Sequence, residues 1–459
     1  MAEGMVARGV ARVRKMLGQE TTVGVLTAKQ TARLRSQLKE CEANQGGEVS
    51  TRLRAARLAE TYFALNDEGR AAFLRMIASE FCPDPKAVEK AHANYQKAFG
   101  SDAQWTAESA LRAALRSKRL RILTQFNALS RGVKFLVDMR ADLLRFMEND
   151  AALRSLDREL EGRLSAWFDV GFLELQRISW NSPAALLEKL IQYEAVHEIR
   201  SWSDLKNRLD SDRRCYAFFH PCMPMEPLIF VEVALVAELA DNVQVLLDEN
   251  APVADSQKTT TAIFYSISNT QAGLRGVSFG NFLLKRVVDD LKRDCPSLTT
   301  FATLSPLPKL RRWAEKTPEV WSQAFTKAMV ERIARLMPEL NLSAADELPR
   351  LLADNGWVEN PRLVQALQPG LARLAARYCL QSKTGTKPYD PVARFHLGNG
   401  ARIERINHLA DRSPNGLKQS YGLMVNYLYD PDAIEANFEA FSLDGAIASS
   451  DGVRRAARD

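Results

Sequence analysis

The sequence predicts an α+β chain of two domains, an all-helical domain followed by a mixed α/β domain. Three observations predict it. Apolar residues recur at helical spacing through most of residues 27–196, the pattern changes to short alternating apolar runs near residue 197, and a strand–turn–helix–strand segment occupies residues 261–308. A chain of 459 residues is long enough for two or three domains.

The first domain, residues 1–193, is expected to be a helical bundle. Ser50 is a candidate N-cap before an apolar run, and Asp84–Pro85 combines an N-cap with proline at the first helical position. Ser182–Pro183 starts a further helix. Between Lys134 and Phe146 the apolar residues form one stripe, which is typical of a bundle core.

The second domain, residues 194–446, is expected to be mixed α/β with a helical insertion. Strand-like runs are Cys215–Phe219, Leu228–Val236, Val392–Leu397 and Leu423–Leu428. Residues 309–380 return to helical spacing, which predicts the insertion. The last thirteen residues, 447–459, are expected to be a flexible tail.

The segment from Thr261 to Pro308 predicts a phosphate site. An alternating strand is followed by a turn with Gly273, Gly276 and Gly280, then by an amphipathic helix and a second strand ending at Leu304. A glycine turn that opens a helix can direct backbone N–H groups at a phosphate. The alternative is a turn that binds nothing, since neither G-x-G-x-x-G nor a P-loop lysine is present.

Charge and cysteine content narrow the function classes. The net charge is +6, and 30 of the 62 Lys and Arg lie in residues 1–190 among acidic residues, so a solvated helix face is favoured over a nucleic-acid surface. The six cysteines form no C-x-x-C or His/Cys cluster, which predicts reduced thiols and no metal site. A redox-active pair of Cys215 and Cys222 is the alternative.

Targeting signals are weak. No apolar run reaches the length of a membrane span. The basic segment 1–17 could be a transit peptide, but Glu3 and the lack of serine favour a plain helix. The C-terminus is no peroxisomal signal, and a cytoplasmic location is expected.

Two residues are candidates for chemistry. His396 precedes a glycine turn in Phe395–Gly400, where an imidazole could face a cleft. Ser305 follows a strand and precedes proline, outside any G-x-S-x-G motif, so a turn residue or a helix N-cap is the alternative.

Several stretches together resemble the malonyl-CoA decarboxylase family. They are YEAVHEI, RRCYAFFHPCMPMEPLIFVEVAL, AIFYSISNTQAGLRGVSFGNFLLKRVV, TLSPLP, FHLGNGA, RINHLAD and GLMVNYLY, in matching order over roughly residues 45–430. The family combines a helical oligomerisation domain with a catalytic domain that resembles GNAT acetyltransferases. The resemblance therefore implies a GNAT-like fold for residues 194–446 and decarboxylation of malonyl-CoA to acetyl-CoA and CO₂, without metal, biotin or another cofactor.

The resemblance also implies the site residues. The catalytic serine and histidine fall on Ser305 and His396, and Tyr429 matches a tyrosine near the active site. With an ordinary pKa near 6.5, His396 would be the general acid. The coenzyme A cradle falls on seven consecutive residues: Arg275, Gly276, Val277, Ser278, Phe279, Gly280 and Asn281. Several relatives carry an acidic residue at the position of Ser278, so a role of that acid in orienting the histidine would pass to another group here or to none.

The expected partners are malonyl-CoA, acetyl-CoA and further copies of the chain, with no nucleic acid. The family implies a homotetramer built as a dimer of dimers and a role in fatty acid metabolism. The apolar side chains of the helical domain exceed what one bundle seam needs, which favours association over a larger monomeric bundle. They include Leu53, Leu58, Phe63, Phe73, Leu74 and Ile77. Alternative functions are a GNAT-type acyltransferase and a non-catalytic coenzyme A-binding scaffold.

Overall fold

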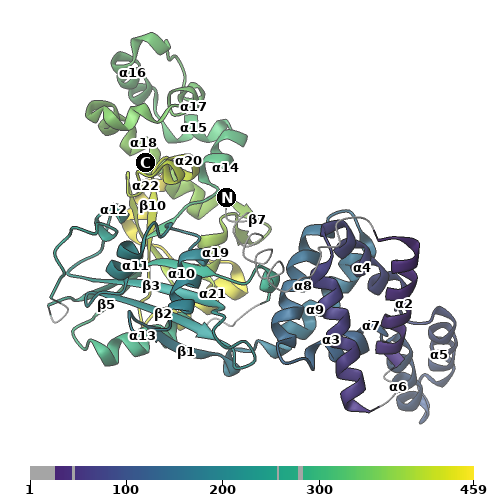
Figure 1. Ribbon diagram of the computed structural model, residues 1–459. Coiled ribbons are helices and arrows are strands. Elements are labelled where there is room, and N and C mark those ends of the chain that lie inside the picture. Colours follow the sequence, from purple (N-terminus) through teal and green to yellow (C-terminus); the bar gives the residue numbers. More distant parts are fainter. Residues whose placement is uncertain (1–25, 44–46, 256–257, 278–282, 459) are drawn as a thin grey trace. The chain divides into compact units, whose positions relative to one another are not determined.

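The computed structural model describes residues 26–43, 47–255, 258–277 and 283–458 of the chain (Figure 1). These residues form two compact units. The helical unit holds the described parts of Met1–Glu174, Phe219–Leu228 and Thr270–Phe279. The sheet unit holds those of Leu175–Phe218, Ile229–Asn269 and Gly280–Asp459. The region expected to be helical up to residue 193 therefore contains a strand and a helix of the sheet unit. The expected N-terminal segment 1–17 lies outside the described residues.

Eight helices make up most of the helical unit in the described part of the chain. They are α2 (Ala28–Ala43), α3 (Glu48–Ala64), α4 (Asp67–Glu80), α5 (Pro85–Ala98), α6 (Gln104–Leu115), α7 (Arg119–Asn127), α8 (Gly132–Phe146) and α9 (Ala151–Trp167). Helices α5 and α6 bury none of their residues. The Asp84 side chain accepts the N–H of Lys86 and Pro85 opens α5, as predicted. The predicted cap at Ser50 is wrong, because α3 starts earlier, with Gly47 at the N-cap.

The apolar stripe predicted between Lys134 and Phe146 forms the centre of this unit. On α8, the side chains of Phe135, Leu136, Met139 and Leu143 are buried. Helix α8 also carries Arg140, whose guanidinium is buried and bonds Asp157 of α9 through Nε at 2.8 Å. A buried arginine needs such partners, since an unpaired charge in the interior is costly.

A distant stretch of the chain packs onto α8. The short 3-10 helix η2 (Ala272–Leu274) lies so close that a Cβ on Gly273 would stand 1.8 Å from the carbonyl oxygen of Val137. Arg140 Nη1 donates to the carbonyls of Gly273 and Arg275, each at 2.8 Å. Glycine is thus required at 273 for helix packing rather than for a ligand.

Within the described residues, the sheet unit contains an eight-stranded sheet in the order β1-β2-β3-β4-β5-β10-β6, with β9 also paired to β10. The strands are β1 (Glu174–Ile178), β2 (Arg213–Phe219), β3 (Ile229–Val236), β4 (Thr261–Asn269), β5 (Thr300–Thr303), β6 (Ser305–Pro306), β9 (Arg402–Asn407) and β10 (Met424–Leu428). Strands β4 and β5 are parallel and are joined through the glycine turn and helix α13 (Leu283–Asp294). This is the strand–turn–helix–strand order that the sequence predicts.

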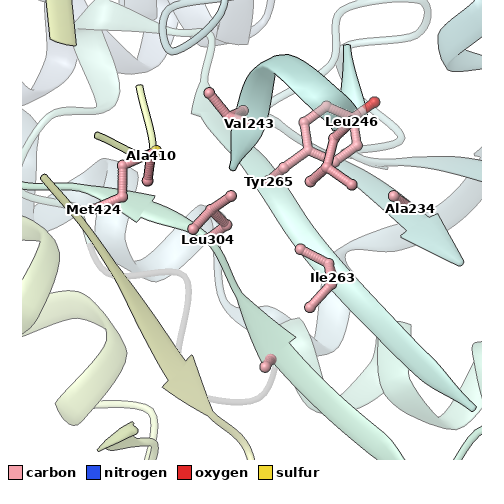
Figure 2. Close-up of a cluster of buried hydrophobic side chains, with 9 residues drawn as sticks. Ala234, Val243, Leu246, Ile263, Tyr265, Leu304, Ala410 and Met424 are labelled. Carbon is pink, nitrogen blue, oxygen red and sulfur yellow. The ribbon is translucent and has the colours of Figure 1, made fainter. Parts of the chain in front are cut away.

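Strand β10 pairs with two successive short strands along the same stretch of chain. Its end bonds β5, with Leu428 opposite Ala302, and its start bonds β6, with Val425 opposite Ser305. Between β5 and β6, at Leu304, the pairing with β10 is interrupted. On the other side of β10, the register with β9 shifts between Asn426 and Tyr427. Leu304 points into an apolar cluster that Figure 2 shows, together with Ile263, Tyr265 and Met424. Because side chains alternate along a strand, Thr303 and Ser305 point to the opposite face.

The predicted helical insertion is confirmed between β6 and β9. Its helices are α14 (Leu310–Lys316), α15 (Glu319–Ala324), α16 (Lys327–Leu336), α17 (Leu348–Leu351) and α18 (Pro361–Gln381), drawn in green in Figure 1. The other helices of this unit are α10 (Ala184–Tyr193), α11 (Trp202–Arg208), α12 (Val243–Leu246), α19 (Pro391–Leu397), α20 (Pro414–Ser420), α21 (Ile434–Asp444) and α22 (Asp451–Arg458). A small hairpin, β7 (Lys383–Thr384) and β8 (Lys387–Pro388), follows α18.

Two expectations about this unit are wrong. Residues Val392–Leu397 form helix α19 instead of a strand, because Asp390 caps it and Pro391 occupies its first turn. The end of the chain is helix α22 instead of a flexible tail. The side chains of Val453 and Ala457 are buried, and Ser450 N–H bonds the carbonyl of Ile403 in β9 at 2.8 Å.

Among the described residues, no helix has the length and apolarity needed to cross a membrane. All six cysteines are free thiols. Cys215 is buried in β2, and burial raises the pKa of its thiol, whereas Cys222 is exposed. A raised thiol pKa opposes thiolate formation, so Cys215 is poorly suited to redox chemistry.

Candidate active site

The structure brings Ser305, His396 and Tyr429 into one chain of hydrogen bonds. Ser305 Oγ lies 3.1 Å from His396 Nε2, and His396 Nδ1 lies 2.7 Å from the hydroxyl of Tyr429. Ser305 and His396 are 91 positions apart in the sequence, and His396 and Tyr429 are 33 positions apart. The motifs that predicted them therefore converge in space.

Each of the three side chains comes from a different element of the sheet unit. Ser305 opens β6, His396 lies in the last turn of α19, and Tyr429 directly follows β10. Tyr429 is fixed there by its own N–H, which bonds the carbonyl of Phe301 at 2.8 Å. The sheet thus holds Ser305 and Tyr429, and α19 inserts the imidazole between them.

Burial controls the charge of this site. Ser305, His396 and Tyr429 are at most 5% exposed. Burial lowers the pKa of His396 to about 3, and it raises the pKa of Tyr429 well above 10. Both groups are therefore neutral at physiological pH. The expectation of an ordinary histidine pKa near 6.5 is wrong, because it ignored the desolvation of the imidazole.

Two further residues touch this chain. The hydroxyl of Ser305 donates to Thr303 Oγ1 at 2.8 Å, and the ring of Tyr427 stacks on the imidazole of His396 with centroids 4.5 Å apart. The sequence analysis did not identify either one. Strand alternation could have found Thr303, since residues two apart on a strand share a face.

A buried carboxylate fixes the helix that carries the imidazole. Asp390 Oδ1 accepts the N–H groups of Val392 and Ala393, and its Oδ2 accepts the hydroxyl of Tyr378 at 2.7 Å. Such a cap holds the first turn of α19 and thereby fixes the position of His396 in its last turn. The sequence Asp390–Pro391 could have predicted the start of this helix.

A cavity of about 230 Å³ adjoins the chain of hydrogen bonds at Tyr429. Its other walls come from the start of α13, the turn after α19 and helix α21: Leu284, Lys285, Asn399, Ile434, Glu435, Phe438 and Glu439. Apolar side chains line it together with Lys285 and two glutamates. Such a mixture suits an extended ligand with both apolar and polar parts.

The predicted coenzyme A cradle is described only in part. Arg275, Gly276 and Val277 belong to the helical unit, and Ser278, Phe279, Gly280 and Asn281 lie outside the described residues. Gly276 has φ +89°, a conformation that favours glycine. The N–H groups of Arg275 and Val277 already bond the carbonyls of Ala272 and Leu274. Both of these N–H groups are therefore already satisfied by main-chain carbonyls.

Comparison with known proteins follows the same division of the chain. Residues 171–459 match the model of the malonyl-CoA decarboxylase C-terminal domain, and residues 81–168 match that of the N-terminal domain. The mitochondrial malonyl-CoA decarboxylase of Anser anser anser is 37% identical over 388 residues, which are 81% of this chain and 76% of that protein. The mitochondrial enzyme of Rattus norvegicus is 39% identical over 335 residues, which are 70% and 68% of the two chains.

Solved structures agree with these relatives. The crystal structure of malonyl-CoA decarboxylase from Rhodopseudomonas palustris matches with a TM-score of 0.82 at 40% identity, covering 93% of this chain and 99% of that one. The Cupriavidus metallidurans structure matches with a TM-score of 0.71 at 44% identity, covering 94% and 100%. The family models, the curated relatives and the solved structures thus agree over most of the chain. This protein belongs to the malonyl-CoA decarboxylase family.

Proposed function

We propose that this protein decarboxylates malonyl-CoA to acetyl-CoA and CO₂. The observation that carries the proposal is the buried chain of hydrogen bonds through Ser305, His396 and Tyr429 in a member of this family. A neutral, desolvated set of hydroxyl and imidazole groups suits a reaction that loses a carboxylate and needs one proton at carbon.

The chemistry places three demands on the site. The bond to the departing carboxylate must stand perpendicular to the thioester plane, the enolate that forms must be stabilised, and a proton must reach the carbon. The thioester accepts the electron pair of the broken C–C bond, so this reaction path calls for neither a metal ion nor an organic cofactor. A prealigned hydrogen-bond donor to the enolate can lower the barrier by about 2.7–4 kcal/mol.

The neutral state of His396 assigns roles to the side chains. Ser305 is the group that meets the malonyl unit, and its hydroxyl proton goes to the carbon as the enolate collapses. As Nε2 of His396 returns a proton to the Ser305 oxygen, Nδ1 takes the hydroxyl proton of Tyr429, so the imidazole stays neutral. A proton from solvent then restores Tyr429, which balances the proton that acetyl-CoA has gained.

The coenzyme A part of the substrate needs its own contacts. The cavity beside Tyr429 is the proposed place for the arm that leads to the thioester, since it reaches the reacting groups. The pyrophosphate is proposed to bind at residues 275–281. Binding at a glycine turn before a helix agrees with the general preference of phosphates for such turns.

The direct test is release of CO₂ and acetyl-CoA from malonyl-CoA by the purified protein, without metal, biotin or acceptor. We expect Ser305→Ala and His396→Asn each to reduce kcat by at least about a hundredfold, the effect of losing a positioned acid or donor. Coenzyme A affinity should change little in both variants. Near-normal turnover in either one contradicts the assignment.

Two alternative functions would give different results in the same assay. An acyltransferase would turn over acetyl-CoA with an amine acceptor and would not need Ser305. A non-catalytic scaffold would bind coenzyme A and release no CO₂.

The assembly and the place of action are further parts of the proposal. We propose a homotetramer, a dimer of dimers, acting in the cytoplasm in fatty acid metabolism, where malonyl-CoA is the activated two-carbon donor. Light scattering at micromolar concentration tests the assembly, and fractionation of cells with detection of the protein tests the location. A monomer, or recovery in an organelle fraction, would contradict the respective part.

A further inference from the structure

We propose that Thr303 is a positioning residue that sets the direction of the protons in the chain Tyr429–His396–Ser305. The inference rests on the proposed function for its catalytic consequence. Its structural part stands on the hydrogen bonds of Thr303 alone. Thr303 is fully buried at the end of β5, where the pairing of β5 with β10 stops.

The hydroxyl of Thr303 takes the place of a main-chain carbonyl in the sheet. One step earlier the ladder is regular, and Tyr429 N–H bonds the carbonyl of Phe301. At the next position, Tyr427 N–H bonds Thr303 Oγ1 at 3.2 Å rather than the Thr303 carbonyl. This bond uses one acceptor site of the hydroxyl and fixes where its oxygen lies.

The displaced carbonyl of Thr303 has its own partner. Asn426 Nδ2 donates to it at 2.8 Å and to the carbonyl of Ala240 at 3.0 Å. The orientation of the Asn426 amide is set in turn, because its Oδ1 accepts from Asn407 Nδ2 and Arg405 Nε. Thr303 is therefore held through both its carbonyl and its side chain.

The second acceptor site of Thr303 Oγ1 takes the proton of Ser305, at 2.8 Å. A hydroxyl has a single proton, so Ser305 can then only accept from His396 Nε2. Nε2 must carry the imidazole proton, and the unprotonated Nδ1 must accept from the Tyr429 hydroxyl, 2.7 Å away. All protons of the chain point in one direction, from Tyr429 toward Thr303.

This direction matters for the reaction. With Nε2 already protonated, His396 cannot act as the base that makes Ser305 a nucleophile, as it would in an acyl-transfer enzyme. Ser305 instead turns its proton from Thr303 to the carbon of the substrate, and Nε2 supplies the replacement while Nδ1 takes the hydroxyl proton of Tyr429. Without the acceptor at Thr303, the Ser305 hydroxyl is free to donate to Nε2, and the opposite tautomer becomes available.

The test compares Thr303→Val, which removes the acceptor at nearly constant volume, with Thr303→Ser, which keeps it. Thr300→Val on the same strand is the matched control. Nitrogen NMR of histidine-labelled full-length protein reports the tautomer, with His396→Asn to assign the signal among five histidines. We expect the Nε2–H tautomer in the wild type, Thr303→Ser and Thr300→Val, and the Nδ1–H form or a mixture in Thr303→Val.

Steady-state kinetics with malonyl-CoA are the second measurement. We expect kcat to fall about tenfold or more in Thr303→Val alone, with KM nearly unchanged. This loss is a part of the roughly 10²–10⁴-fold rate gain that a positioned general acid provides.

The outcomes separate this inference from the proposed function. An Nδ1–H tautomer in the wild type, or an unchanged tautomer and kcat in Thr303→Val, overturns the role of Thr303 even if the protein decarboxylates malonyl-CoA. Absent decarboxylation overturns the proposed function and leaves the NMR result to judge the tautomer. If Thr303→Val does not fold, Tyr429→Phe decides. Retention of Nε2–H there supports Thr303 as the controlling group, and its loss assigns the control to Tyr429.

Discussion

At the scale of single residues, the histidines of the sheet unit are held in their neutral form. Burial lowers the pKa of His408 to about 4 and that of His396 to about 3. Between these values and the ordinary pKa near 6.5, the unfolded chain binds more protons than the folded one. The free energy of unfolding therefore decreases as the pH falls below about 6.5.

A substitution at His408 isolates part of this effect. His408→Phe keeps an aromatic ring beside Trp357, 6.4 Å away, and removes the titrating group. We expect the variant to lose less stability than the wild type between pH 6.5 and 4, by up to about 3 kcal/mol. Thermal unfolding at several pH values measures it, and the exposed-surface control is His92→Phe. If the free energy of unfolding depended on pH equally in the wild type and in His408→Phe, His408 would not contribute to this loss of stability.

The sequence predicted three residues that lie together in the structure, and it predicted less about their surroundings. Ser305, His396 and Tyr429 were found through motifs of the family. Thr303 was not, because its role depends on an interruption of strand pairing that only the folded sheet reveals. The charge state of His396 was also missed, since no local pattern reports how completely a side chain will be buried.

At the scale of elements, helix α19 shows what a cap contributes to a site. We expect Asp390→Ala to destabilise the protein by about 0.5–2 kcal/mol, the usual loss for an N-cap, and to lower kcat about ten- to hundredfold by displacing His396. Asp390→Asn keeps an oxygen for the N–H groups of Val392 and Ala393. It should retain most of the activity. Thermal unfolding and steady-state kinetics measure both effects, and equal kcat in the two variants would argue against a positioning role.

The same element explains an error of the sequence analysis. The strand-like run Val392–Leu397 predicted a strand, although Asp390–Pro391 repeats the cap and proline that correctly predicted helix α5 after Asp84. In a segment of seven residues, apolar periodicity is too short to distinguish the two structures. The capping chemistry was the stronger signal, since it specifies where backbone N–H groups are satisfied.

The glycine turn gives a second prediction at this scale. Gly276→Val places a branched side chain at φ +89°, within the proposed pyrophosphate site, so we expect coenzyme A affinity to fall strongly in a folded, less stable protein. The matched control is Gly385→Val, which also has a left-handed φ, +64°, but has open space around it. It should lose stability without losing affinity. Calorimetry with coenzyme A compares the two, and unchanged affinity in Gly276→Val would place the phosphate elsewhere.

At the scale of the whole molecule, the helical unit retains exposed apolar side chains. Of the residues that suggested a surplus, Leu58, Phe73, Leu74 and Ile77 are fully buried within the unit, so their area is already used. Leu53 and Phe63 are 55% and 39% exposed. Helices α5 and α6 bury none of their residues, and Trp105 of α6 is 75% exposed. The prediction of an assembly therefore depends on these side chains.

We expect Trp105→Asp to weaken self-association, because it places a charge on an apolar contact without disturbing the core. Light scattering over a concentration series should show smaller particles for this variant than for the wild type. Lys90→Asp on the neighbouring helix α5 is a control for the change of charge. An identical mass for all three proteins would exclude α6 from the contact.

The bonds of Arg140 have a consequence for how the protein is made. The carbonyls that this buried guanidinium holds belong to Gly273 and Arg275, which are 133 and 135 residues further along the chain. At a synthesis rate of about 5–20 residues per second, they follow Arg140 by roughly 7–27 s. During that interval the nascent helices contain a guanidinium that has Asp157 as a partner but lacks both carbonyls. The helical unit therefore completes its fold only after the ribosome has passed the glycine turn, well into the sequence of the sheet.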